Sequence, residues 1–111
     1  MAMQKIGKML LKNTGGFVAR IAFTYVDVNG NATTQADPKG QDILLGASST
    51  VDPGDRGVPD GSLIYLHVYV LHGQANQASR AFLYEKGNTA VANYVISGTT
   101  VDNDLGLMGI S

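Results

Sequence analysis

The amino-acid sequence predicts an all-β protein, an antiparallel β-sandwich that forms one domain over residues 1–111. Three observations support this prediction: the acids are eight Asp and one Glu, 14 glycines divide the chain, and apolar residues alternate along several segments. Glu favours helices, whereas Asp competes with the backbone and favours turns. A chain of 111 residues can bury a core without covalent staples, and this one contains no cysteine.

The first strand is expected at residues 8–12, with residues 1–8 either disordered or forming a short helix. Residues 17–28 predict a second strand, because every other residue from Phe17 to Tyr25 is apolar. The clearest strand is predicted at residues 62–72. The residues with aliphatic side chains on one face of that strand are Ile64, Leu66, Val68 and Val70.

Three more strands are expected at residues 41–51, 78–84 and 90–101. The first of them would place Ile43, Leu45, Ala47 and Val51 on one face, with a bulge at Gly46. Residues 52–61 cannot form a central strand, because Pro53 and Pro59 lack N–H donors. With no helix available for a crossover, five or six antiparallel strands in two sheets are expected.

Charge and hydropathy narrow the classes of partner. The net charge of −1 leaves no basic face for nucleic acid, so no nucleic-acid partner is expected. No run approaches the ~18 apolar residues of a membrane-spanning helix. Lys8 interrupts the apolar residues near the N-terminus, so a signal peptide is not predicted. Synthesis in the cytoplasm is expected, with a non-classical route if the protein is released.

No enzyme activity, cofactor or metal is expected. The sequence has no cysteine nucleophile, and its two histidines, His67 and His72, would fall on opposite faces of one strand. Acidic residues cluster at 52–60 and 102–104, where Ca²⁺ binding is the alternative to ordinary turn chemistry. Turn chemistry is the favoured interpretation, because neither spacing matches an EF-hand.

Five segments follow one another in the order of a known family over roughly residues 10–105. They are the opening strand at 13–25, a Gly-Gln-Asp element at 39–42, a Ser/Thr-rich stretch at 48–50, a Val-Pro-Asp-Gly turn at 58–61 leading into 64–70, and the closing strand at 94–101. In this order they resemble the C-terminal membrane-recognition domain of the cholesterol-dependent (thiol-activated) cytolysins, here as a stand-alone domain. The resemblance implies a four-stranded sheet packed on a second sheet, with loops at one tip that touch a membrane.

Two segments depart from the cytolysin pattern. Residues 71–80 correspond to the family's Cys- and Trp-containing tip loop, yet they have neither residue and retain only the final Arg80. Thr100-Val101 is the nearest match to the family's sterol-reading Thr-Leu pair. Trp is the side chain best suited to the membrane interface, and this sequence has none. A head group or a glycan is therefore a better expected ligand than the interior of the lipid bilayer. The family's pore-forming domains do not fit in 111 residues, so the chain alone is not expected to form a pore.

The leading hypothesis is a non-enzymatic recognition module that docks on a cell surface, on a lipid head group or a glycan, through loops at one tip. Such a module fits a toxin or a host-defence protein, alone or with a pore-forming partner protein. The residues expected to make the contact are Gln74, Asn76, Gln77, Arg80, Thr99, Thr100 and Val101.

The second candidate surface is the other face of residues 62–72, which carries Tyr65, His67 and Tyr69. These side chains form either a lectin-like platform for a sugar or partner, or an aromatic stripe that only stabilises the sheet. The alternative function is a structural subunit that forms a homo-oligomer or binds another chain, because interfaces are rich in Tyr and poor in charge.

Overall fold

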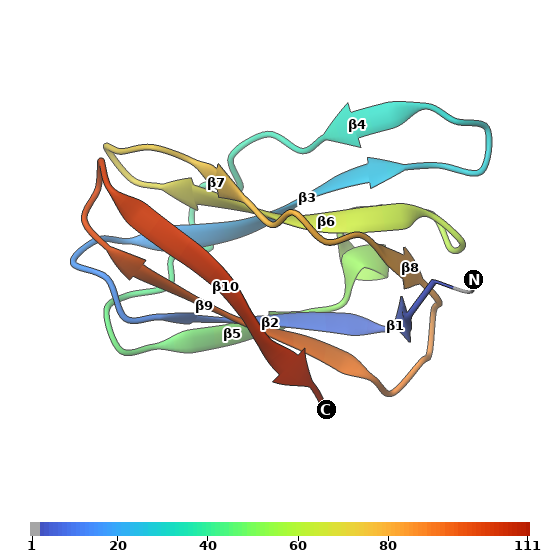
Figure 1. Cartoon of the computed structure of the whole chain (residues 1–111). Helices are drawn as coiled ribbons and strands as arrows, with labels where there is room; N and C mark the ends of the chain where they lie inside the picture. The colour runs from blue at the N-terminus through green and yellow to red at the C-terminus, as the bar shows by residue number, and fades with distance from the viewer. Residues whose placement is uncertain (1–2) are drawn as a thin grey trace.

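Two β-sheets packed face to face make up the computed structural model, which describes residues 3–111 (Figure 1). The first sheet has the order β1-β8-β6-β3-β4, with β7 added beside β6. Its strands are β1 (Lys5–Ile6), β3 (Ala19–Val26), β4 (Ala32–Thr34), β6 (Leu63–Val70), β7 (Asn76–Gln77) and β8 (Phe82–Tyr84). The second sheet has the order β10-β9-β2-β5, with β2 (Lys8–Asn13), β5 (Ser48–Val51), β9 (Val91–Gly98) and β10 (Asn103–Ile110). These two sheets confirm the predicted all-β sandwich.

The core lies between the two sheets and is filled by the alternating apolar residues of both. The largest of these fully buried side chains are Tyr84, Tyr94, Phe23, Phe82, Ile6, Met9, Leu11, Ile21, Ile64, Leu66, Ile96 and Val68. The alternation predicted for β6 is confirmed, since its aliphatic face is buried while Tyr65, His67 and Tyr69 are half-buried on the outer face. In β3 the expected inner face is buried except for the half-buried Tyr25, but Arg20 and Ala22 of the other face are buried as well. Burial of these side chains is the main favourable contribution to folding.

Two strand pairs are parallel, which the sequence analysis did not expect. β1 pairs with β8, and β2 pairs with β9, each in parallel orientation. The chain connecting β2 to β9 passes through the rest of the sandwich, so no crossover helix is needed. At Gly7 the chain moves from the first sheet to the second, and a Cβ there would lie 1.9 Å from Asn88 O. Glycine is therefore required at this crossing.

Several expected element bounds are wrong. Of residues 41–51 only β5 is a strand; Ile43 makes an isolated bridge with Ala19, and Gly46 lies in a turn at φ +85° rather than in a bulge. The expected strand 78–84 is limited to β8, and β4, β7 and β10 were not expected. A short helix or disorder was expected for residues 1–8. Over 5–8 these form β1 and the start of β2, and Met1 and Ala2 lie outside the described residues.

The acidic turn before β6 caps a short 3₁₀ helix, η1 (Pro53–Arg56). The carboxylate of Asp52 accepts a hydrogen bond from Gly54 N at 2.9 Å and another from the Tyr84 hydroxyl. Burial raises the pKa of Tyr84 to about 12, and the hydrogen bond to Asp52 acts in the same direction. Asp60 accepts from Lys86 N at 2.8 Å. Both acids are thus engaged in turns. Within residues 3–111 no three His, Asp or Glu side chains gather as a metal site, and no helix is long and apolar enough to cross a membrane.

Two buried tyrosines are expected to respond in opposite ways to loss of the hydroxyl group. The Tyr94 hydroxyl is buried with no hydrogen-bond partner, whereas that of Tyr84 donates to Asp52. Tyr94→Phe should therefore raise the free energy of unfolding, and Tyr84→Phe should lower it, each by about 1 kcal/mol. Urea denaturation at pH 7 measures both, and changes of the same sign would contradict the hydrogen bonding described.

The same tyrosines predict a loss of stability at high pH. Burial raises the pKa of Tyr94, like that of Tyr84, to about 12, above the value of about 10 expected in the unfolded chain. The unfolded state therefore loses these protons first, and the free energy of unfolding should fall as the pH rises from about 10 to 12. In Tyr94→Phe this fall should be smaller than in the parent protein, as measured by urea denaturation across that range.

Candidate functional site

Four loops meet at one end of the sandwich, which we call the tip (Figure 1, left). They comprise residues 14–18 between β2 and β3, 42–47 before β5, 71–75 between β6 and β7, and 99–102 between β9 and β10. Backbone hydrogen bonds of 2.7–3.1 Å join three of these loops: Leu71 N to Val18 O, Gly16 N to Gly98 O, and Gln74 N to Thr100 O.

The fourth loop is attached to the tip by Asn13, the last residue of β2, which is completely buried. Its side-chain Nδ2 donates to Phe17 O at 2.7 Å and to Ile43 O at 3.0 Å. Its Oδ1 accepts from Gly15 N at 2.9 Å, and its backbone carbonyl accepts from Gly46 N at 2.7 Å. One amide group thus bonds to backbone atoms of both loops, 14–18 and 42–47; of these atoms, Ile43 O also accepts from Ala19 N of β3 at 3.0 Å.

A second asparagine, Asn103 at the start of β10, joins the other two loops. Its Nδ2 donates to Gln74 O at 2.9 Å, and its Oδ1 accepts from Asn76 Nδ2 at 2.8 Å. The loops also touch at Gly73, where a Cβ would lie 2.2 Å from Thr100 O. The two backbones can approach this closely only because residue 73 is glycine.

Loop 42–47 is also fixed from the outer face of the first sheet. Arg20 on β3 is almost completely buried, and its Nε donates to Asp42 Oδ1 at 2.7 Å. Its Nη1 donates to Asp37 at 3.0 Å. The hydrogen bonds to Asp42 and then Asp37 raise the pKa of Arg20. Two charge-assisted contacts hold the segment immediately before Ile43 and Leu44 in place.

The tip exposes three apolar side chains in two of its loops, Leu44 and Leu45 in one and Val101 in the other, which together we call the apolar patch. Their exposed fractions are 59%, 65% and 71%. Leu44 was not among the predicted contact residues, and Leu45 was expected on the buried face of a strand. Leu44 and Leu45 are consecutive apolar residues followed by Gly46, so they break the alternation of apolar and polar residues that a strand requires. This break was the signal in the sequence for a turn.

The tip is also nearly free of charge. None of its four loops contains Lys or Arg, and its carboxylates are those of Asp42, bonded to Arg20, and Asp102. His72 lies at φ 59°, the one non-glycine residue with positive φ among residues 3–111. A histidine in this conformation is uncommon and belongs to the sharp turn that ends β6.

The expected contact residues divide among three places. Gln74, Thr99, Thr100 and Val101 lie in the tip loops, and Asn76 lies directly behind them, bonded to Asn103. Gln77 lies on the outer face of the first sheet. Arg80 lies away from the tip loops, because the chain after β7 runs back along β6.

The second candidate surface lies on the outer face of the first sheet, where His67 is hydrogen-bonded to Gln77. Gln77 Oε1 accepts from Thr24 Oγ1 at 2.7 Å and lies 2.9 Å from His67 Nδ1. The rings of His67 and Tyr69 meet edge to face with centroids 4.7 Å apart. Tyr65 precedes them on the same face of β6. These side chains lie together as the strand period requires, and their role as a sugar platform stays a prediction.

No family model matches the chain, and no curated protein matches it in sequence. Solved structures do match its fold. The crystal structure of wild type pneumolysin is 16% identical, with a TM-score of 0.50 over 91% of this chain and 22% of that chain. Listeriolysin O is 18% identical, with a TM-score of 0.49 over 91% of this chain and 22% of that chain. The membrane-binding domain of pneumolysin is 15% identical, with a TM-score of 0.48 over 93% of this chain and 96% of that chain.

The match to pneumolysin confirms that the fold is similar to that of the cytolysins, as the ordered segments implied. The chain spans 22% of the length of the whole cytolysins. At this level of identity the similarity is one of fold.

Two glycines of the tip are expected to differ in their tolerance of alanine. In Gly73→Ala the new Cβ meets Thr100 O, so the free energy of unfolding should fall by about 1–3 kcal/mol. Gly16→Ala is the control, because its Cβ has open space and should change stability by no more than about 0.5 kcal/mol. Urea denaturation measures both. Equal effects would mean that the two loops do not touch in solution.

Proposed function

We propose that this chain docks on a membrane surface through its tip, with Leu44, Leu45 and Val101 entering the head-group region of the lipid. The exposed apolar patch carries the proposal. Single exposed leucines are ordinary, but here an adjacent pair and a valine occupy the same end of the molecule. Asn13 holds the loop of the two leucines by a buried amide, so little ordering is needed on contact.

The charge of the tip supports a neutral lipid surface. Without Lys or Arg in its loops, the tip has no electrostatic attraction to anionic head groups. Binding should therefore occur on phosphatidylcholine alone, should not increase with phosphatidylserine, and should change little with salt.

The proposal agrees with the tip loops in contact with a membrane that the cytolysin-like segments imply. It also describes the chain as a recognition module without catalytic activity. A head group is the favoured ligand and a glycan the alternative. A module of this kind would serve a toxin or a host-defence protein, either alone or beside a pore-forming partner protein.

Flotation with phosphatidylcholine vesicles, with and without cholesterol, tests the proposal. The double variant Leu44→Ser/Leu45→Ser should bind at least about 10-fold more weakly, because burying a leucine side chain is worth about 1.5–3 kcal/mol. Val28→Ser is the matched control, since Val28 is as exposed as the tip residues but lies in the turn between β3 and β4, at the far end (Figure 1).

Equal loss of binding in Val28→Ser, or unchanged binding in the double variant, would contradict docking through the tip. A folded parent protein that binds a glycan array and no vesicle would also contradict it, and would make the surface of Tyr65, His67 and Tyr69 the next candidate. Sedimentation without vesicles separates docking from self-assembly. Docking predicts that the parent protein is a monomer and that the two leucine substitutions do not change its sedimentation.

A further inference from the structure

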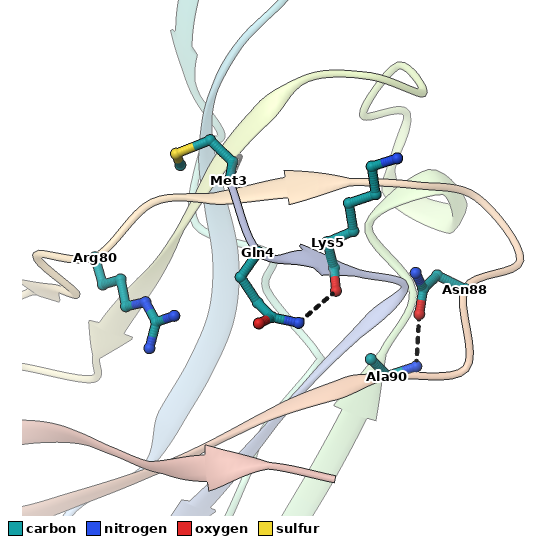
Figure 2. A pocket seen from close by; sticks show the side chains of 6 residues that line it. All are labelled: Met3, Gln4, Lys5, Arg80, Asn88 and Ala90. Atoms are coloured by element: carbon teal, nitrogen blue, oxygen red, sulfur yellow. Dashed lines mark hydrogen bonds between the residues drawn. The ribbon is translucent and has the colours of Figure 1, made fainter. Parts of the chain in front are cut away.

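We infer that a second site, distant from the tip, binds a small organic anion. A pocket of about 590 Å³ opens beside the first strand (Figure 2). Its lining residues are Met3, Gln4, Lys5, Arg80, Asn88 and Ala90. The pocket is shallow and largely open, so a ligand would lie against its polar groups with one side in solvent.

The walls of this pocket are held in place without a ligand. Leu83 N donates to Gln4 O at 2.9 Å, which fixes the strand that carries Gln4 and Lys5. On the other wall, Asn88 Oδ1 accepts from Ala90 N at 2.8 Å and holds the turn between β8 and β9. A ligand would therefore meet a preformed site, which lowers the entropic cost of binding.

The pocket has an uncompensated positive charge. Its lining includes two cations and no acid; Lys5 is paired with Glu85 at 3.4 Å, outside the lining. The guanidinium of Arg80 stacks over the Phe82 ring at 4.6 Å and takes part in no ion pair among residues 3–111. Figure 2 shows this guanidinium directed toward the amide of Gln4.

The chemistry of the lining defines the ligand class. A guanidinium whose face is covered by an aromatic ring still presents its N–H edge, which matches the two oxygens of a carboxylate or phosphate. The Gln4 amide can exchange hydrogen bonds with hydroxyl groups, and Met3 and Ala90 offer apolar contact. A molecule of monosaccharide size that carries one carboxylate or phosphate fits these features.

The position of the pocket makes the inference independent of the proposed docking. Five of its lining residues belong to the N-terminal segment and the β8–β9 turn, at the end of the molecule opposite the tip (Figure 1), and the sixth, Arg80, lies between β7 and β8. None of the four tip loops contributes a residue to the pocket lining, so lipid bound by the tip loops does not fill the pocket. The anion is therefore dissolved or carried by a partner, not part of the docked lipid surface.

Chemical-shift titration of the ¹⁵N-labelled protein tests this inference with three probes: glucuronate, glucose 6-phosphate and neutral glucose. Either anion should produce saturable shifts at Gln4, Lys5, Leu83 and Asn88, and glucose should not. Arg80→Met should weaken the binding at least 10-fold. Arg80→Lys keeps the charge but loses the planar guanidinium edge that donates two parallel hydrogen bonds, and it should weaken the binding less. Lys39→Met removes the same charge from an exposed turn elsewhere and should bind as the parent does.

Glucose shifts equal to those of the anions, no saturable shift with either anion, or equal binding by Arg80→Met and the parent would each overturn the inference. The spectra of the variants report directly whether they are folded. Vesicle flotation of Arg80→Met should equal that of the parent, and failure of either proposal is thus distinguishable from failure of the other.

Discussion

The buried side chain of Asn13 is the interaction on which the arrangement of the tip depends. Where β2 ends, two loops bury backbone groups, and the amide of Asn13 bonds to Gly15 N, Phe17 O and Ile43 O, the last of which also accepts from Ala19 N. Each buried group left without a partner costs about 1–3 kcal/mol. Neither a hydrophobic residue nor a carboxylate could replace this side chain, because two donors and one acceptor are all in use.

The two sheets supply the rigid support that makes such loops useful. The core residues of β3 and β6 hold the first sheet against the second, and the loops at their ends inherit that fixed position. A stable, neutral apolar patch at one end and a cationic pocket at the other give the molecule two chemically different ends. This separation would let a surface-bound domain hold a second ligand at the end that faces solution.

The sequence predicted those parts of the fold that depend on local periodicity. Alternation along β3 and β6 was clear because both strands are long and half of their residues enter the core. β10 escaped prediction because Gly106 and Gly109 interrupt its alternation, and β4 because all three residues are exposed. The parallel pairing of β2 with β9 joins residues about 80 positions apart, and nothing in either segment encodes it.

Only part of the candidate site could be located from the sequence. The loop 73–80 and the turn 99–101 were expected at one tip from their resemblance to family segments; loops 71–75 and 99–102 do lie side by side, whereas Arg80 lies away from them. Leu44 and Leu45 were missed, because apolar residues near β5 are indistinguishable from strand interior until the bond between Asn13 and Ile43 O is known. Hydrogen exchange of backbone amides in Asn13→Ala tests the central claim most directly. Protection should be lost at Gly15, whose N–H donates to the Asn13 side chain, while β3 and β6 stay protected, and parent-like protection of Gly15 would contradict it.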